Sequence, residues 1–259
     1  MRIILLMSLI GCLRAEAQCL PPRPLWILSG QSNMCGAGLV SEEPGNDVSL
    51  ASVAYWYRDM DGSAVVSAES SDWVPLAPVG GAFGPEVSFG VNAPSRSVIL
   101  KTCFLGASIR SWTDPALHPA TVAAYEAAVN EAASDWGHTY WKVAGYIWVQ
   151  GHSDTVSDAY GIAYESLLTD FITQERKRFD DPALPFIISS APSGWSARDG
   201  YDEFVASQQA VTAANAHTYL VDASDLELKI DDTHFTSASQ VELGERLAAQ
   251  ANATCVICQ

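Results

Sequence analysis

The stretch WILSGQSNMCGAG, residues 26–38, decides the fold, because an apolar run ends there abruptly in small polar residues. The apolar run spans 24–28 and has the length of a buried strand. In an open α/β sheet such a break lies at the carboxyl end of a strand, where reactive groups are exposed. We therefore predict that Ser32, which follows the break, is a nucleophile. Its structural alternative is to cap the next helix.

Four further apolar runs have the spacing of strands in one sheet, and helical patterns lie between the later runs. This alternation is typical of parallel β-α-β units and predicts an α/β fold with a central five-stranded parallel sheet. The expected strands are 24–28, 97–104, 145–149, 186–189 and 218–222, and the expected helices are 121–136, 158–179 and 240–251. Residues 39–96 are rich in Gly, Pro, Ser and Asp, and we expect them to form a long irregular segment.

The residues that follow the predicted strands supply the groups that a serine nucleophile needs: a base, a carboxylate that orients it, and oxyanion donors. Asp231 and His234 are three residues apart, so the carboxylate can reach one imidazole nitrogen while the other faces outward. We predict that His234 is the base and Asp231 orients it. The predicted oxyanion donors are the backbone N–H groups of Ser32 and Gly106 and the side-chain amide of Gln150.

The N-terminus has the pattern of a secretory signal, with Arg2, an apolar run over 3–10 and a cleavage-site sequence, AEA, at 15–17. We therefore expect a signal peptide over 1–17, a single domain over 18–259 and a secreted, extracellular protein. A bacterial lipoprotein with a lipid on Cys12 is the alternative. A retained membrane anchor is disfavoured, because a bilayer core needs about 20 apolar residues.

Five cysteines remain after residue 17. In an oxidising compartment Cys19 can pair with Cys255 or Cys258, or the last two can pair with each other, and the sequence leaves this connectivity open. Cys35 and Cys103 are expected to be small buried residues. The C-x-x-C pair has no second ligand pair for zinc, so we expect neither a metal nor a cofactor.

The formal net charge of −16 argues against two classes of partner. Nucleic acid and anionic lipid both attract patches of Lys and Arg, and the sequence has no such patch. We therefore expect a substrate that is not a polyanion, no nucleic acid partner, and no membrane contact unless Cys12 carries a lipid. The oligomeric state is not determined by the sequence.

Five sequence blocks occur in the order found in the SGNH hydrolase superfamily: GQSNM at 30–34, GGAFGPE at 80–86, K-x(4)-G-x-S-x(3)-W at 101–112, WVQGHSD at 148–154 and DDTHF at 231–235. Over about residues 24–250 the chain resembles the carbohydrate esterase branch, which includes sialate O-acetylesterases and acetylxylan esterases. The resemblance implies a flavodoxin-like three-layer α/β/α sandwich and an esterase that removes acetyl groups from a carbohydrate through an acyl-serine. It implies Ser32, Asp231 and His234 as the triad and Gly106 and Gln150 as oxyanion donors.

One block departs from the branch, because many members carry Glu where this chain has His152. The carboxylate role therefore falls on Asp231, with Asp154 as a second candidate. His152 is a candidate substrate contact, with simple packing as its alternative. The other candidate substrate-binding residues are Gln31, Asn33 and Glu86, and Glu86 has the alternative of holding the 39–96 segment in place.

Two alternative functions remain open beside carbohydrate deacetylation. A lipase-like or thioesterase-like enzyme on the same fold would prefer long acyl chains, and a non-catalytic carbohydrate-binding relative would have an idle site. Three tryptophans, Trp73, Trp112 and Trp195, are candidates for a sugar-stacking surface, although we expect at least two of them in the core. The identity of the acetylated sugar is not determined by the sequence.

Overall fold

The structure is a computed structural model that describes residues 22–61, 65–70, 72–114, 122–124, 126–127, 129–131 and 141–258. The expected signal peptide, Cys12 and Cys19 lie outside these residues. Half of the expected helix 121–136 also lies outside them, and its described residues are helical.

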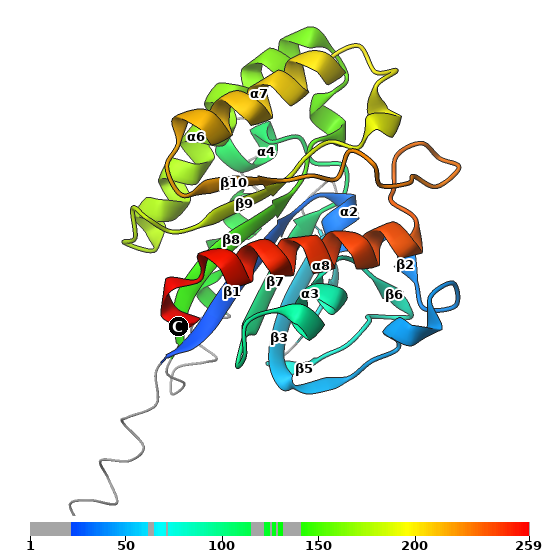
Figure 1. Cartoon of the computed structure of the whole chain (residues 1–259), viewed down its shortest axis with the longest axis vertical. Coiled ribbons are helices and arrows are strands. Elements are labelled where there is room, and N and C mark those ends of the chain that lie inside the picture. Colours follow the sequence, from blue (N-terminus) through cyan, green and yellow to red (C-terminus); the bar gives the residue numbers. More distant parts are fainter. Residues whose placement is uncertain are drawn as a thin grey trace, which may run out of the picture.

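An eight-stranded sheet crosses the described part of the chain in the order β10-β9-β8-β1-β7-β3-β4, with β5 paired to β3 (Figure 1). The strands from β10 to β3 are parallel, whereas β4 and β5 run antiparallel to β3. Their bounds are β1 Arg23–Gly30, β3 Leu50–Met60, β4 Val66–Glu69, β5 Val74–Leu76, β7 Val98–Phe104, β8 Trp141–Val149, β9 Phe186–Ser189 and β10 Thr218–Val221. A separate pair is formed by β2 Gly38–Leu39 and β6 Ala82–Phe83.

The mostly parallel sheet confirms the predicted fold class, but the sheet is wider than the five strands expected. The five expected strands are β1, β7, β8, β9 and β10, and the additional strands come from the segment 39–96, which we expected to be irregular. The longest of them, β3, pairs in parallel with β7 from Ala54 opposite Val98 to Met60 opposite Phe104. Its aromatic sequence, AYWY at 54–57, favours a strand, and this signal is masked by the polar residues around it.

Helices cover both faces of the sheet (Figure 1). One face carries α4 Arg110–Thr113, α6 Asp158–Arg178 and α7 Tyr201–Ala214, and the other carries α2 Ser32–Cys35, α3 Glu86–Asn92 and α8 Ser237–Thr254. Short 3-10 turns are η2 Pro44–Asn46, η3 His152–Asp154, η4 Ser193–Trp195 and η5 Val256–Cys258. Thr236 caps the last helix, since its Oγ1 accepts a hydrogen bond from the Ser239 N–H at 3.2 Å. The sequence pattern did not predict α7.

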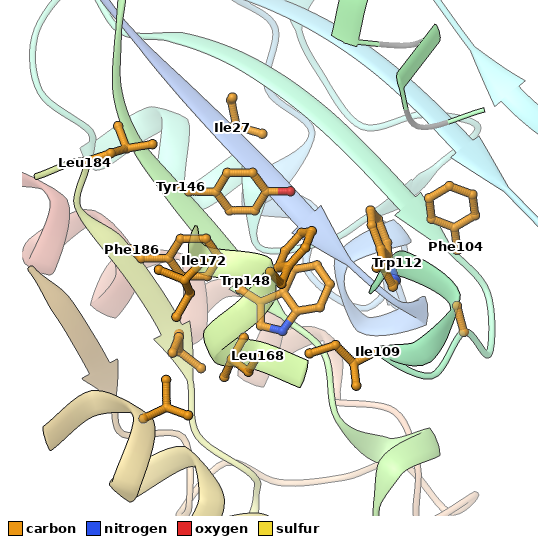
Figure 2. Close-up of a cluster of buried hydrophobic side chains, with 14 of the residues drawn as sticks. Ile27, Phe104, Ile109, Trp112, Tyr146, Trp148, Leu168, Ile172, Leu184 and Phe186 are labelled. Carbon is orange, nitrogen blue, oxygen red and sulfur yellow. The ribbon is translucent and has the colours of Figure 1, made fainter. Parts of the chain in front are cut away.

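The central strands are buried on both faces, which explains their continuous apolar runs. In β1, Leu25 and Ile27 pack toward α6, while Trp26 and Leu28 pack toward α8. Figure 2 shows aromatic side chains on the α6 side of the sheet, where Trp148 lies beside Trp112 with their ring centroids 5.1 Å apart. The described residues include no helix with the length and apolar composition to cross a membrane.

Two disulfides lie within the described residues. The terminal pair, Cys255 and Cys258, closes on itself, which is one of the alternatives that the sequence left open. Cys35 and Cys103 are also bonded, with their Cα atoms 5.3 Å apart, so the expectation that they are merely small buried residues is wrong. The pairing arises because α2 turns back over the end of β7. Sequence reasoning missed it because 68 residues separate the two cysteines.

Candidate active site

The site lies at the carboxyl ends of β1, β7 and β8, and the register of these strands brings their following loops together. Gly30, the last residue of β1, lies opposite Cys103 on one side and Val149 on the other. A Cβ atom at Gly30 would overlap the carbonyl oxygen of Val149, so this position requires glycine. The chain then turns directly into α2, which begins at Ser32.

The structure brings the three predicted catalytic residues into one hydrogen-bonded chain, although 202 residues separate the serine from the histidine. Ser32 Oγ lies 2.9 Å from His234 Nε2, and His234 Nδ1 lies 2.7 Å from Asp231 Oδ2. The second carboxylate oxygen of Asp231 accepts hydrogen bonds from the backbone N–H groups of Thr233 at 3.0 Å and His234 at 2.9 Å. This geometry is that of a nucleophile, a base and its orienter.

The Asp231 carboxylate is ionised at neutral pH. Partial burial raises the pKa of Asp231, but hydrogen bonds from His234 and the Thr233 N–H outweigh it and lower the pKa to about 2. A carboxylate is a hydrogen-bond acceptor only, so it binds the Nδ1–H tautomer of His234 and leaves Nε2 free to accept the serine proton.

Asn33 connects the nucleophile turn to the loop that carries the base. Its Oδ1 accepts a hydrogen bond from the Phe235 N–H at 3.0 Å, and its Nδ2 donates to the Thr233 carbonyl at 3.3 Å. Gln31 makes a similar connection to the loop after β8, because its Oε1 accepts the Gly151 N–H at 3.0 Å. Both side chains are buried. The expectation that they are substrate contacts is therefore corrected for Asn33, whose side-chain oxygen and nitrogen both form hydrogen bonds inside the protein. For Gln31, burial and the bond of Oε1 to the Gly151 N–H favour the same structural role.

The side chain of Gln150 does not offer its amide to an oxyanion. Its Nε2 donates to the Ala107 carbonyl at 3.1 Å and to Asp154 Oδ2 at 2.5 Å. Both partners are acceptors, so the nitrogen rather than the oxygen must face them. Gln150 is buried and its Oε1 has no hydrogen-bond partner among the described residues. The expected oxyanion role of Gln150 is thus replaced by a structural role beneath the loop after β7.

Two backbone donors remain for an oxyanion. The N–H groups of Ser32 and Gly106 have no acceptor within the part of the chain that the structure describes. Gly106 has a φ of 67°, a left-handed conformation that favours glycine, and its carbonyl accepts a hydrogen bond from Ser153 Oγ at 2.9 Å. Both donors therefore remain available in a loop and a turn that are held by other contacts.

Asp154, the second candidate for the triad carboxylate, serves the loop after β7 instead. Its two oxygens accept hydrogen bonds from Ser108 Oγ at 2.7 Å and the Ile109 N–H at 3.0 Å. Burial raises the pKa of Asp154, while hydrogen bonds from Ser108, Gln150 and Ile109 oppose that rise. Because its partners lie in this loop and not on the imidazole, the structure favours Asp231 as the orienter.

Glu86 is buried and cannot contact a substrate, which corrects that expectation and favours its structural alternative. Its Oε1 accepts hydrogen bonds from Lys101 Nζ at 3.3 Å and the Gly84 N–H at 3.2 Å. Lys101 is also buried, lies 3.5 Å from Asp59, and donates to the Cys35 carbonyl at 2.9 Å. Sequence reasoning gave Lys101 and Asp59 no role, although Lys101 begins one of the five sequence blocks.

His152 lies next to the base loop without contacting the triad. Its Nε2 is 3.4 Å from Thr233 Oγ1, and its ring packs edge-on against Trp195 with the centroids 5.1 Å apart. Burial lowers the pKa of His152 to about 4, and the nearby charges of Arg198 and His234 contribute to the same shift. The ring is therefore neutral at neutral pH.

The tryptophans considered for sugar stacking are mainly core residues. Trp112 and Trp195 are buried, as expected for at least two of the three, and Trp73 packs partly buried against the same core. Among the described residues, no three His, Cys, Asp or Glu side chains are grouped to hold a metal ion.

Comparison with known proteins gives consistent matches over nearly the whole described chain. Residues 22–253 match the family described as carbohydrate esterase, sialic acid-specific acetylesterase. A probable carbohydrate esterase from Arabidopsis thaliana is 27% identical over 249 residues, which cover 88% of this chain and 90% of that protein.

Two solved structures share the fold. A protein from Arabidopsis thaliana has a TM-score of 0.67 at 23% identity, covering 91% of this chain and 100% of that chain. A carbohydrate acetylesterase from Xanthomonas citri has a TM-score of 0.65 at 18% identity, covering 90% of this chain and 56% of that chain.

Proposed function

Because the chain belongs to the carbohydrate esterase family described as sialic acid-specific acetylesterases, we propose that it is a serine esterase that removes O-acetyl groups from a carbohydrate. The observation that carries the proposal is the continuous hydrogen-bonded chain from Ser32 through His234 to Asp231.

We include secretion in the proposal, since the N-terminal sequence has a signal pattern and two disulfides suit an oxidising compartment. N-terminal sequencing of the exported protein tests this. A protein that begins at Gln18 would support cleavage after residue 17, and one that begins at a lipid-bearing Cys12 would support the lipoprotein alternative instead.

The chemistry proceeds in two halves. Ser32 Oγ attacks the acetyl carbonyl carbon while His234 Nε2 takes the serine proton, and the N–H groups of Ser32 and Gly106 donate to the resulting oxyanion. The bond to the sugar oxygen then breaks, and His234 returns the proton to that oxygen. Water attacks acetyl-Ser32 with His234 again as base, and acetate leaves. Each backbone donor of this kind contributes about 3 to 4 kcal/mol in the transition state.

The length of the acyl chain distinguishes this function from that of a lipase or thioesterase. We expect p-nitrophenyl acetate to be hydrolysed faster than p-nitrophenyl octanoate, measured as kcat/KM. Among acetylated sugars, the family description leads us to expect the highest kcat/KM on O-acetyl sialic acid, with acetylated xylan and acetylmannan as comparison substrates. Preference for octanoate would favour a lipase, and absence of both hydrolysis and fluorophosphonate labelling at Ser32 would favour a non-catalytic binding protein.

Activity is expected to fall as the solution is acidified, because His234 must be neutral to accept the serine proton. Two neighbouring side chains keep their charge state near neutral pH. Asp231, with a pKa of about 2, stays ionised there, and His152, with a pKa of about 4, stays neutral there. A loss of rate on acidification is therefore assigned to His234, the base that accepts the serine proton. The measurement is kcat/KM against pH for the parent and His152→Gln, whose acid limbs should coincide. A flat profile from about pH 4 to 8 would contradict the role of His234.

A further inference from the structure

We propose that the Cys35–Cys103 disulfide is a positioning element of the active site, which fixes the nucleophile turn against the strand that leads to the oxyanion glycine. The inference rests on the proposed esterase function. It states that loss of this disulfide lowers turnover rather than substrate affinity.

Each cysteine lies three residues from one of the two residues, Ser32 and Gly106, whose N–H groups must donate to the same oxyanion. Cys35 ends the single-turn helix α2, three residues after Ser32, and Cys103 lies in β7, three residues before Gly106. A helix of four residues has too few internal hydrogen bonds to hold its own position. The disulfide therefore supplies a covalent attachment between the turn that carries the nucleophile and the strand that precedes the second oxyanion donor.

A hydrogen bond from Lys101 also attaches Cys35 to β7. Lys101 Nζ donates to the carbonyl of Cys35, and the Lys101 ammonium is itself held by Glu86 and Asp59 in the interior. The carboxylates of Glu86 and Asp59 raise the pKa of Lys101, which stays charged despite its burial. The C-terminal end of α2 is thus fixed to β7 by one covalent bond and one charged hydrogen bond, both at Cys35.

The precision of this attachment matters because the N–H groups of Ser32 and Gly106 belong to different segments and must donate to one oxygen atom. Oxyanion donors act when they lie about 2.7 to 3.1 Å from the developing charge. A displacement of about 1 Å can cost about 100-fold in rate. Without the disulfide, α2 remains attached through Lys101 and Asn33, but its distance from Gly106 is less constrained.

Reduction of the bond by a dithiol reagent transfers two electrons and two protons, yields two thiols on the protein and oxidises the reagent to its own disulfide. Cys35 is half-buried and Cys103 is fully buried, so Cys35 is the sulfur that the reagent would attack first.

The chain contains a matched control. Cys255 and Cys258 form a disulfide with the same Cα separation, 5.3 Å. They follow the C-terminal end of α8, whereas the base loop precedes its N-terminal end, so the 18-residue helix separates them from the site by about 27 Å.

The experiment compares C35S/C103S with C255S/C258S on p-nitrophenyl acetate, at a temperature well below the melting temperature of each variant. We expect kcat of C35S/C103S to fall about 10- to 100-fold, with KM within about twofold of the parent and slower fluorophosphonate labelling of Ser32. The C255S/C258S variant should keep the parent kcat. Wild-type kcat in folded C35S/C103S, or a change confined to KM, would overturn the proposal.

Reduction of the C255S/C258S variant by dithiothreitol keeps the proposal testable if C35S/C103S does not fold. In that variant, peptide mapping after iodoacetamide alkylation reports the Cys35–Cys103 bond, because alkylated Cys35 and Cys103 are identified separately from Cys19. We expect kcat to fall as the bond is reduced and to return on reoxidation, with unchanged far-UV circular dichroism. Full activity in the reduced, alkylated protein would overturn the positioning role. If the parent itself neither hydrolyses acetate esters nor labels at Ser32, the proposed function fails instead.

Discussion

The Ser32→Ala variant is expected to lose about 10,000-fold or more in kcat on p-nitrophenyl acetate, with KM nearly unchanged. The serine oxygen forms the bond to the acetyl group, and within the described residues Ser32 Oγ is the hydroxyl that lies 2.9 Å from His234 Nε2. The residual rate comes from the oxyanion donors and from binding. The measurement is the initial rate at saturating substrate, together with fluorophosphonate labelling followed by mass spectrometry of the peptide that contains residue 32.

Ser166→Ala is the matched control, since Ser166 is exposed on α6 and its hydroxyl donates to the Ala163 carbonyl of the preceding turn. It should keep the parent rate and the parent labelling. The double variant S32A/H234A should be no slower than S32A, because residues that act as one unit are not additive. Hydrolysis by Ser32→Ala at the parent rate would show that the acyl-serine mechanism is wrong.

The Asp231→Asn variant is expected to lose about 1,000- to 10,000-fold in kcat. The introduced amide nitrogen would face His234 Nδ1, favour the tautomer with the proton on Nε2, and remove the acceptor for the serine proton. The side chain of Asp231 is 46% exposed, so the melting temperature should change little at neutral pH. Because the folded-state pKa is lowered, the stabilising contribution of Asp231 is present above about pH 4 and is lost as the pH falls toward 2.

Asp154→Asn provides the contrast between the two candidate carboxylates. Asp154 is buried and accepts hydrogen bonds from Ser108, Ile109 and Gln150, so its replacement should lower the free energy of unfolding by about 1 to 3 kcal/mol. Thermal unfolding measures this effect, and kcat should fall less than in Asp231→Asn. A larger loss of kcat in a fully stable Asp154→Asn protein would mean that the carboxylate roles are reversed.

Five of the parallel strands, β1, β7, β8, β9 and β10, could be predicted from sequence because they are mostly buried and form continuous apolar runs. The parallel strand β3 could not be predicted, since the charged residues Arg58 and Asp59 directly follow its aromatic residues. Those charges are accommodated only by tertiary partners: Arg58 pairs with Glu69, and Asp59 with Lys101. A pattern that depends on distant counter-charges is not visible in a local window of sequence.

The triad could be predicted because each member follows a strand, and strand ends in a parallel sheet share one edge. The roles of Gln31, Asn33 and Gln150 could not be predicted, because an amide in a polar motif can bind either a substrate or the backbone. Burial decides between these roles, and burial of a loop residue depends on the packing of several loops. The Cys35–Cys103 bond depended likewise on the path of α2, which its four residues do not specify.

The link between Asn33 and the base loop has a consequence for the order in which activity is acquired during synthesis. The nucleophile leaves the ribosome about 200 residues before the histidine that activates it. Contacts of such high sequence separation form late and slow the folding of a domain. The Asn33 contacts to Thr233 and Phe235 form only when the last loop docks, so a nascent chain carries its serine in an inactive state until the base loop has been made and folded onto the sheet.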